Sequence, residues 1–167
     1  MLDMSPLGPR LRRWLSRGRP STAEELQRCI ELQFLYRGVS TLELRSVTVT
    51  ESLAAVEIYA RPIFPDDRRI QHRTREAACA EQLFHDAVTV LDTIWRSAPE
   101  MESVRLSVWV KTVDGVGHEL PVLTTHVLRA QAAGVSAGRV GPFDVLRRFS
   151  TRARIDRHGN FHDEREL

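Results

Sequence analysis

The sequence of 167 residues lacks several of the patterns from which a function is usually inferred. It has two cysteines, Cys29 and Cys79, but no Cys-x-x-Cys pair and no cysteine and histidine cluster with zinc-site spacing. Each cysteine lies beside apolar residues in a predicted helix, so we expect buried free thiols and no disulfide. No glycine-rich phosphate-binding loop occurs. The sequence therefore predicts neither a bound metal nor a cofactor.

Long apolar runs and lysine are also scarce. No run approaches the roughly 18 apolar residues of a transmembrane helix. No apolar stretch follows the arginines near the N-terminus, as it would in a secretory signal. We therefore expect a cytoplasmic protein. Lys111 is the only lysine among 24 basic residues. Such a bias can reflect the base composition of a genome, so the number of arginines does not by itself indicate phosphate recognition.

Charge is distributed unevenly along the chain. The net charge is +4 in residues 1–20, −4 in 21–138, +4 in 139–157 and −2 in 158–167. An acidic central part thus lies between two basic ends. The chain length predicts a single core domain over residues 21–130. We expect a basic N-terminal arm before it, and a linker, a short helix and a basic tail over residues 131–167.

One long helix is predicted from about Thr74 to Ser97. Its apolar residues recur at steps of three and four, at Ala80, Phe84, Ala87, Leu91 and Ile94. Pro99 ends this helix, because proline disfavours a helical conformation in the residue before it. A second helix is predicted over residues 21–37, where Ser21 and Glu24 form a capping box. Its expected buried residues are Leu26, Cys29, Ile30 and Phe34.

Two stretches alternate as β-hairpins, over residues 41–61 and about 104–127. In the first hairpin the alternation slips at Arg45 and Ser46, which predicts a β-bulge. In the second, the expected core-facing residues are Val104, Leu106, Val108, Val110, Leu120, Val122, Thr124 and His126. The sequence thus predicts an α+β fold with an antiparallel four-stranded sheet. Two main helices would pack on one face in the order αββαββ, and a short C-terminal helix would begin at Pro142.

The opposite face of this sheet is expected to carry four large apolar residues, Tyr59, Trp109, Leu123 and Val127. A water-facing sheet surface is usually polar, so these residues indicate a covered face. The cover is either the C-terminal segment, a second copy of the chain or another protein. The residues of the C-terminal segment that could provide it are Phe143, Leu146, Phe149 and Ile155. The four apolar residues and Trp14 are the candidate partner-binding residues.

Arginines near both ends are candidate anion-binding residues: Arg12, Arg13, Arg147, Arg148, Arg152 and Arg154. In residues 1–20, Trp14 and neighbouring leucines can form one apolar face of a short helix among these arginines. Such an arm could bind an anionic membrane or an acidic partner. The alternatives are a flexible tail, or a helix whose Trp14 docks on the protein's own core.

One catalytic motif is present, because residues 134–138 match the G-x-S-x-G pattern around Ser136. The residues that follow, up to Pro142, break a helix, and no pattern of alternating parallel strands and helices surrounds the motif. A serine hydrolase is therefore the least favoured function. The sequence favours a small non-enzymatic protein-interaction domain, an adaptor or assembly subunit. It would bind a protein or a second copy through the outer sheet face and the basic ends. A nucleic-acid-binding protein that uses the basic termini is the alternative.

Overall fold

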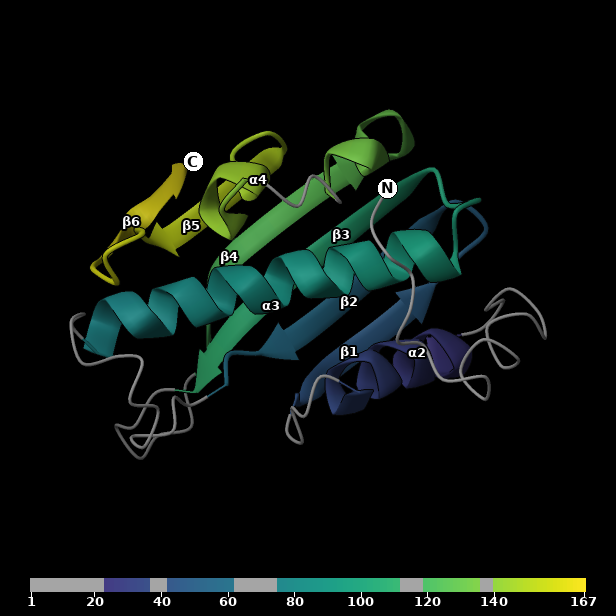
Figure 1. The fold of residues 1–167 in the computed structure, drawn as a ribbon, viewed down its shortest axis with the longest axis horizontal. Coiled ribbons are helices and arrows are strands. Elements are labelled where there is room, and N and C mark those ends of the chain that lie inside the picture. The colour runs from purple at the N-terminus through teal and green to yellow at the C-terminus, as the bar shows by residue number, and fades with distance from the viewer. Residues whose placement is uncertain (1–22, 37–41, 62–74, 112–118, 136–139) are drawn as a thin grey trace.

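The computed structural model describes residues 23–36, 42–61, 75–111, 119–135 and 140–167. The elements in chain order are α2 (Ala23–Tyr36), β1 (Leu44–Val49), β2 (Leu53–Tyr59), α3 (Arg75–Ser97), β3 (Ser103–Lys111), β4 (Glu119–Leu128), the 3₁₀ helix η2 (Arg129–Gly134), α4 (Pro142–Leu146), β5 (Ser150–Ile155) and β6 (Phe161–Glu166). The helices α2, α3 and α4 lie on one face of a single sheet (Figure 1). None of the described helices is both long and apolar enough to span a membrane.

The sheet is mixed and has six strands in the order β1-β2-β3-β4-β5-β6. Neighbouring strands are antiparallel except β2 and β3, which are parallel. The α+β class is confirmed, but the predicted antiparallel four-stranded sheet is wrong. Helix α3 has 23 residues and is about 35 Å long at 1.5 Å per residue. It returns the chain to the end of the sheet at which β2 begins, so β3 runs in the direction of β2.

The C-terminal part of the chain extends the sheet. Strand β5 pairs with β4, and β6 pairs with β5, so the predicted order αββαββ ends two strands too early. Helix α4 packs beside α3, where the rings of Phe143 and Phe84 meet edge to face at 5.1 Å between centroids. Leu146, Phe149 and Ile155 are buried in the core. The C-terminal segment therefore does not cover the outer sheet face, which was one of the predicted covers.

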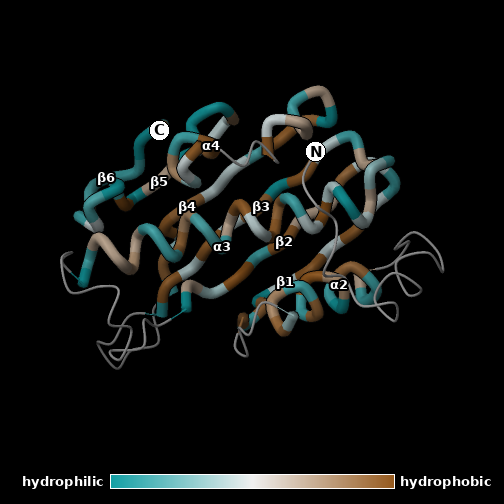
Figure 2. Tube along the Cα trace, in the orientation of Figure 1, coloured by the Kyte–Doolittle hydropathy of each residue, from teal (hydrophilic) through white to brown (hydrophobic). Residues whose placement is uncertain are grey.

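The core lies between the helices and the inner face of the sheet. Figure 2 shows hydrophobic positions along the central strands and at intervals along α3. The predicted stripe of α3 is confirmed, because Ala80, Phe84, Ala87, Leu91 and Ile94 are each at most 1% exposed. The predicted buried residues of α2 are also buried, from Leu26 to Phe34. Both cysteines are free thiols; Cys29 is buried as expected, whereas Cys79 is only half-buried.

The described sheet has three register shifts, and the two within β1 to β4 decide which side chains of those strands face away from the helices. The shift between β1 and β2 lies between Leu44 and Ser46, which confirms the predicted bulge. A second shift separates Val108 and Trp109 on β3. Val108 pairs with Leu123 whereas Trp109 pairs with Pro121, so β4 contains one extra residue.

This second bulge makes part of the predicted outer face wrong. Leu123 and Val127 were expected to face outward, but they are 1% and 0% exposed and lie in the core. Val122 is the extra residue and stays in the core, so the alternation reverses from Leu123 onward: Leu123, Thr125 and Val127 face the core, and Thr124 and His126 face outward. His126 was expected on the core face and is exposed instead.

The turn between β5 and β6 fits closely against the start of α3. Asp156 accepts hydrogen bonds from the backbone of His158 and Asn160, and its other oxygen accepts one from the Asn160 side chain. These bonds lower the pKa of Asp156 to about 2, with the side-chain bond from Asn160 contributing most. Gly159 has a φ of +85°, and a Cβ there would lie 2.2 Å from the backbone of Glu76. The turn therefore requires glycine at this position.

A buried ion pair joins α3 to the end of β2. Nε and Nη2 of Arg61 donate to the two carboxylate oxygens of Asp86, each at 2.7 Å. The two side chains are only 13% and 5% exposed. Gln82 also donates to the carbonyl oxygen of Arg61 at 3.3 Å. This bidentate pair fixes the position of the helix above the strand.

Replacing Asp86 with asparagine should lower the free energy of unfolding by about 3 kcal/mol, because Arg61 then keeps a buried, unpaired charge. The control is Glu24→Gln, which removes a carboxylate from the exposed pair between Glu24 and Arg28. That change should cost less than about 0.5 kcal/mol. Urea denaturation of both variants measures the difference. Equal losses would show that the Arg61 and Asp86 pair does not fix α3.

Candidate functional site

The candidate site is the sheet face that points away from the helices, here called the outer face. No described element covers it (Figure 1). The strand pairings and the two bulges place these residues on it: Ser46, Thr48, Ala55, Glu57, Tyr59, Arg105, Ser107, Trp109, Lys111, Glu119, Pro121, Thr124, His126, Ser150, Arg152 and Arg154. Arg45, in the bulge of β1, reaches the same face through its contacts. The outer face is therefore rich in charged and hydroxyl side chains and contains two aromatic rings.

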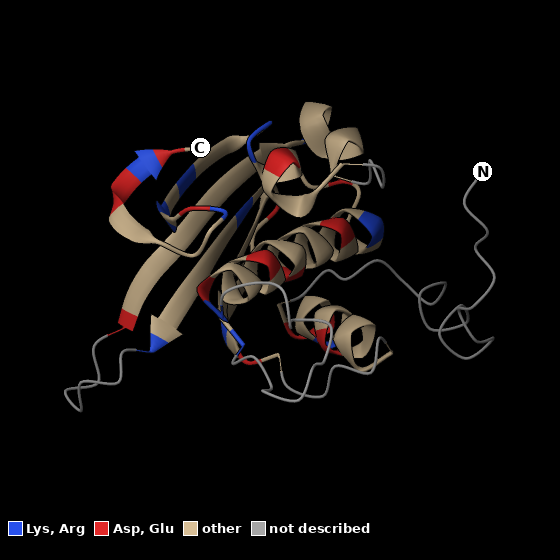
Figure 3. Cartoon of the chain, turned by 60° about the vertical axis from the view of Figure 1, so that its left-hand side comes forward, with Lys and Arg blue, Asp and Glu red and all other residues tan. Residues whose placement is uncertain are grey.

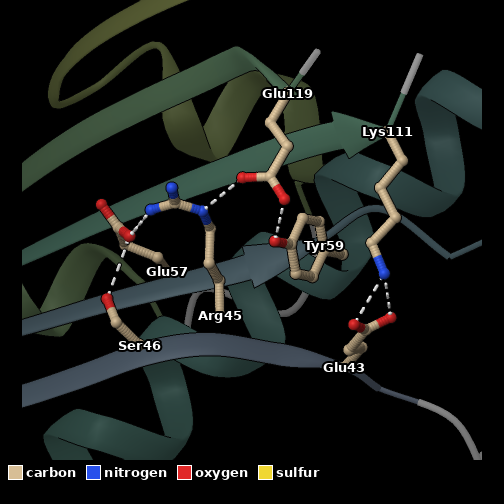
Figure 4. Close-up of polar contacts among 7 residues, drawn as sticks. All are labelled: Glu43, Arg45, Ser46, Glu57, Tyr59, Lys111 and Glu119. Carbon is tan, nitrogen blue, oxygen red and sulfur yellow. Dashed lines mark hydrogen bonds and ion pairs between the residues drawn. The ribbon is translucent and has the colours of Figure 1, made fainter. Parts of the chain in front are cut away.

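One half of the outer face is a linked set of ion pairs and hydrogen bonds, here called the Arg45 cluster (Figure 4). Its members are Glu43, Arg45, Ser46, Glu57, Tyr59, Lys111 and Glu119. Nη1 of Arg45 donates to Glu57 at 2.5 Å, and Nε donates to Glu119 at 2.9 Å. Ser46 also donates to Glu57, at 3.0 Å. The hydroxyl of Tyr59 donates to the second oxygen of Glu119 at 2.5 Å. Arg45 of the edge strand thus reaches across β2 and β3 to a carboxylate on β4.

Each outer-face aromatic ring lies beneath a cation. The guanidinium carbon of Arg45 lies 4.1 Å from the centroid of the Trp109 ring. Nζ of Lys111 lies 4.3 Å from the centroid of the Tyr59 ring and donates to both carboxylate oxygens of Glu43, at 2.7 and 2.8 Å. Such cation–π contacts hold the rings and the cations in place. Nε1 of Trp109 is buried and has no hydrogen-bond partner in the structure as described.

Hydrogen bonds within the cluster shift the pKa values of its members. The bond to Glu119 raises the pKa of Tyr59, because a phenolate would lie against the carboxylate. The bonds from Tyr59 and Arg45 lower the pKa of Glu119. The bonds to Glu43 raise the pKa of Lys111. All of these shifts favour the charge states that hold the cluster together at neutral pH.

The second half of the outer face, over β3 to β5, is basic. Arg105 pairs in register with His126, and Arg152 lies opposite Thr124 on the next strand. Arg154 lies near Glu164 of β6, at 3.9 Å. Figure 3 shows basic positions on the strands next to β6, while β6 itself carries both signs of charge.

The structure brings together only some of the predicted site residues. Tyr59 and Trp109 are register partners on β2 and β3. Leu123 and Val127 are in the core and do not belong to the site. Arg152 and Arg154 lie on the outer face, whereas Arg147 and Arg148 are exposed in the turn after α4. The remaining predicted residues, Arg12, Arg13, Trp14 and Ser136, lie outside the described residues.

The carboxylates that organise the site were not predicted from the sequence. Glu57 could have been found, because it alternates with the core residues of β2. Glu119 has no such signal, since its partner Arg45 is 74 residues away in the chain. Arg61, which the alternation of β2 would put on the outer face, turns instead to Asp86.

The chain matches no known family model, no curated protein and no solved structure. In the parts of the chain that are described, no group of three or more histidine, cysteine, aspartate or glutamate side chains could hold a metal ion. The outer face is therefore the feature from which a function can be inferred.

The tyrosine titration tests the Arg45 cluster. The chain has two tyrosines, so a Tyr36→Phe variant reports on Tyr59 alone. Its absorbance at 295 nm should titrate at a pKa above the ordinary value for tyrosine, because the bond to Glu119 opposes ionisation. Adding Glu119→Gln should lower that pKa, whereas Glu51→Gln, on the turn after β1, should leave it in place. An unchanged titration with Glu119→Gln would contradict the hydrogen bond.

Proposed function

We propose that this chain is a non-enzymatic protein-interaction domain, an adaptor or assembly subunit that binds a protein through its outer sheet face. One observation carries the proposal: the outer face is uncovered within the described structure, yet it holds Tyr59 and Trp109 in a fixed arrangement. A sheet face that only meets water does not need aromatic rings. Tyrosine, tryptophan and arginine are the residues that most often dominate the energy of protein interfaces.

The order of the Arg45 cluster supports the same function on energetic grounds. Long charged side chains normally lose conformational freedom when a partner binds, at about 0.5–1.5 kcal/mol for each side chain. Arg45 and Lys111 are already held by carboxylates and rings before any partner arrives. A partner that covers Trp109 and Tyr59 would therefore meet a surface that needs little further ordering.

The two basic ends of the chain have different places in the proposed interface. Arg152 and Arg154 lie on the outer face, so they could contribute to the same interface. The basic N-terminal arm with Trp14 stays a proposed second contact, to a protein or to an anionic membrane.

A nucleic-acid-binding function is the second candidate, and the arginines of β5 favour it. Phosphate binding would make the affinity fall steeply with salt concentration. The carboxylates of Glu43, Glu57 and Glu119 oppose it, because they lie on or beside the same face. Absence of DNA and RNA binding at low salt would remove this candidate.

Replacing Trp109 with glutamate should weaken partner binding by about 30-fold, which corresponds to the 2 kcal/mol of an interface hot spot. If the partner is a second copy of the chain, light scattering of the purified protein at two salt concentrations detects the complex. For another protein, it is detected by affinity capture and mass spectrometry.

The matched control is Leu35→Glu, which changes an exposed apolar residue on α2, on the other side of the sheet. Thermal melting of both variants checks that they fold. A folded Trp109→Glu protein that keeps the same partner would sink the proposal, and so would an equal loss in the control.

A further inference from the structure

The basic half of the outer face contains a compact set of hydrogen-bond donors. The set consists of the guanidinium groups of Arg105 and Arg152, the hydroxyls of Ser107 and Thr124 and the imidazole of His126, and is here called the basic strip. Arg105 is opposite His126, Ser107 is opposite Thr124, and Thr124 is opposite Arg152. The five side chains therefore come from adjacent positions on three neighbouring strands. The two hydroxyl oxygens lie 3.3 Å apart, in hydrogen-bonding contact.

Within the described structure, the two arginines of the basic strip form no ion pairs. Arg45 and Lys111 each have carboxylate partners, whereas no ion pair among the described residues involves Arg105 or Arg152, although Glu166 of β6 is the register partner of Arg152. Glu57 is in line with Ser107 on the neighbouring strand, yet Arg45 and Ser46 already occupy its carboxylate. Arg105 and Arg152 are both exposed.

The spacing of the two arginines indicates the shape of a ligand. Adjacent strands are about 4.8 Å apart, and successive residues on one face of a strand are about 6.8 Å apart. Arg105 and Arg152 differ by two strands and by one such step, so their Cα atoms are about 12 Å apart. In an extended peptide, residues four positions apart are separated by about 13 Å. Two carboxylates with that spacing can each form a bidentate pair with one guanidinium group.

We propose that the basic strip binds an acidic, extended segment of the protein partner, with carboxylates over Arg105 and Arg152. This inference rests on the proposed function and names the chemistry of the partner. The segment would also contact the hydroxyls of Ser107 and Thr124 between the two arginines. Ser107 is two residues from Trp109 on β3, so the strip and the aromatic rings form one continuous surface.

The surroundings of the strip favour a short acidic peptide over a nucleic acid. Carboxylates border the strip on both sides: Glu57 and Glu119 in the Arg45 cluster, and Glu164 and Glu166 on β6. A strand of nucleic acid carries a phosphate at every nucleotide, so it would run into these carboxylates on leaving the strip. An acidic peptide segment can change to neutral residues where they begin.

The test measures binding of a fluorescein-labelled hexaglutamate peptide to the full chain by anisotropy, at about 50 mM salt. The variant Arg105→Gln with Arg152→Gln should bind about tenfold more weakly, because two solvent-exposed ion pairs with the peptide are lost. The matched control is Arg147→Gln with Arg148→Gln, which removes the same charge from the exposed turn after α4. That control should change the affinity less than about twofold. Hexaglutamine should not bind to any of the proteins.

Three results would overturn the inference. Equal losses in the two double variants would show general charge attraction, and no loss in Arg105→Gln with Arg152→Gln would show that the strip is not the site. A thymidine oligonucleotide of twelve nucleotides that binds more tightly than hexaglutamate through the same two arginines would identify a nucleic acid as the occupant. These results are independent of the Trp109→Glu experiment, so failure of this inference can be told apart from failure of the proposed function.

Discussion

The packing of α3 across the sheet is the constraint on which the rest of the structure depends. Its apolar stripe covers the central strands, and the buried pair of Arg61 and Asp86 fixes the helix to the end of β2. Because α3 carries the chain back along the sheet, β2 and β3 become parallel neighbours within an otherwise antiparallel sheet. The two hairpins on either side then extend the sheet outward, and α2 and α4 pack beside α3 on the same face.

Covering one face only leaves the other to be stabilised by its own side chains. The two halves of the outer face differ in how their charged side chains are paired. Over β1 to β4, Arg45 and Lys111 lie on the rings of Trp109 and Tyr59 and are neutralised by carboxylates. Over β3 to β5, the basic strip keeps its charge. The ordered half suits the burial of aromatic surface, and the charged half suits an acidic ligand, so one partner can use both.

Features set by a local sequence pattern were predicted correctly. The stripe of α3 and the bulge at Arg45 and Ser46 follow from spacing within single elements. Predictions were wrong or missing where a single added residue sets which face a side chain occupies, or where the partner of a side chain is distant in the chain. The extra residue of β4 reversed the faces of Leu123 and Val127, and no local pattern marks a single added residue beside Pro121. The direction of β3 depends on where α3 ends in space. Tyr59 and Trp109 could be found by alternation, but the bond between Arg45 and Glu119 joins residues far apart in the chain.

The most direct test of the outer face as a partner surface is photocrosslinking in living cells. A benzophenone amino acid is introduced at Ser107, at the centre of the outer face, and separately at His85, on the exposed side of α3. If the outer face binds a protein or a second copy of the chain, position 107 should form covalent adducts to that protein and position 85 should form none. Adducts from position 85 alone, or from neither position, would contradict such binding.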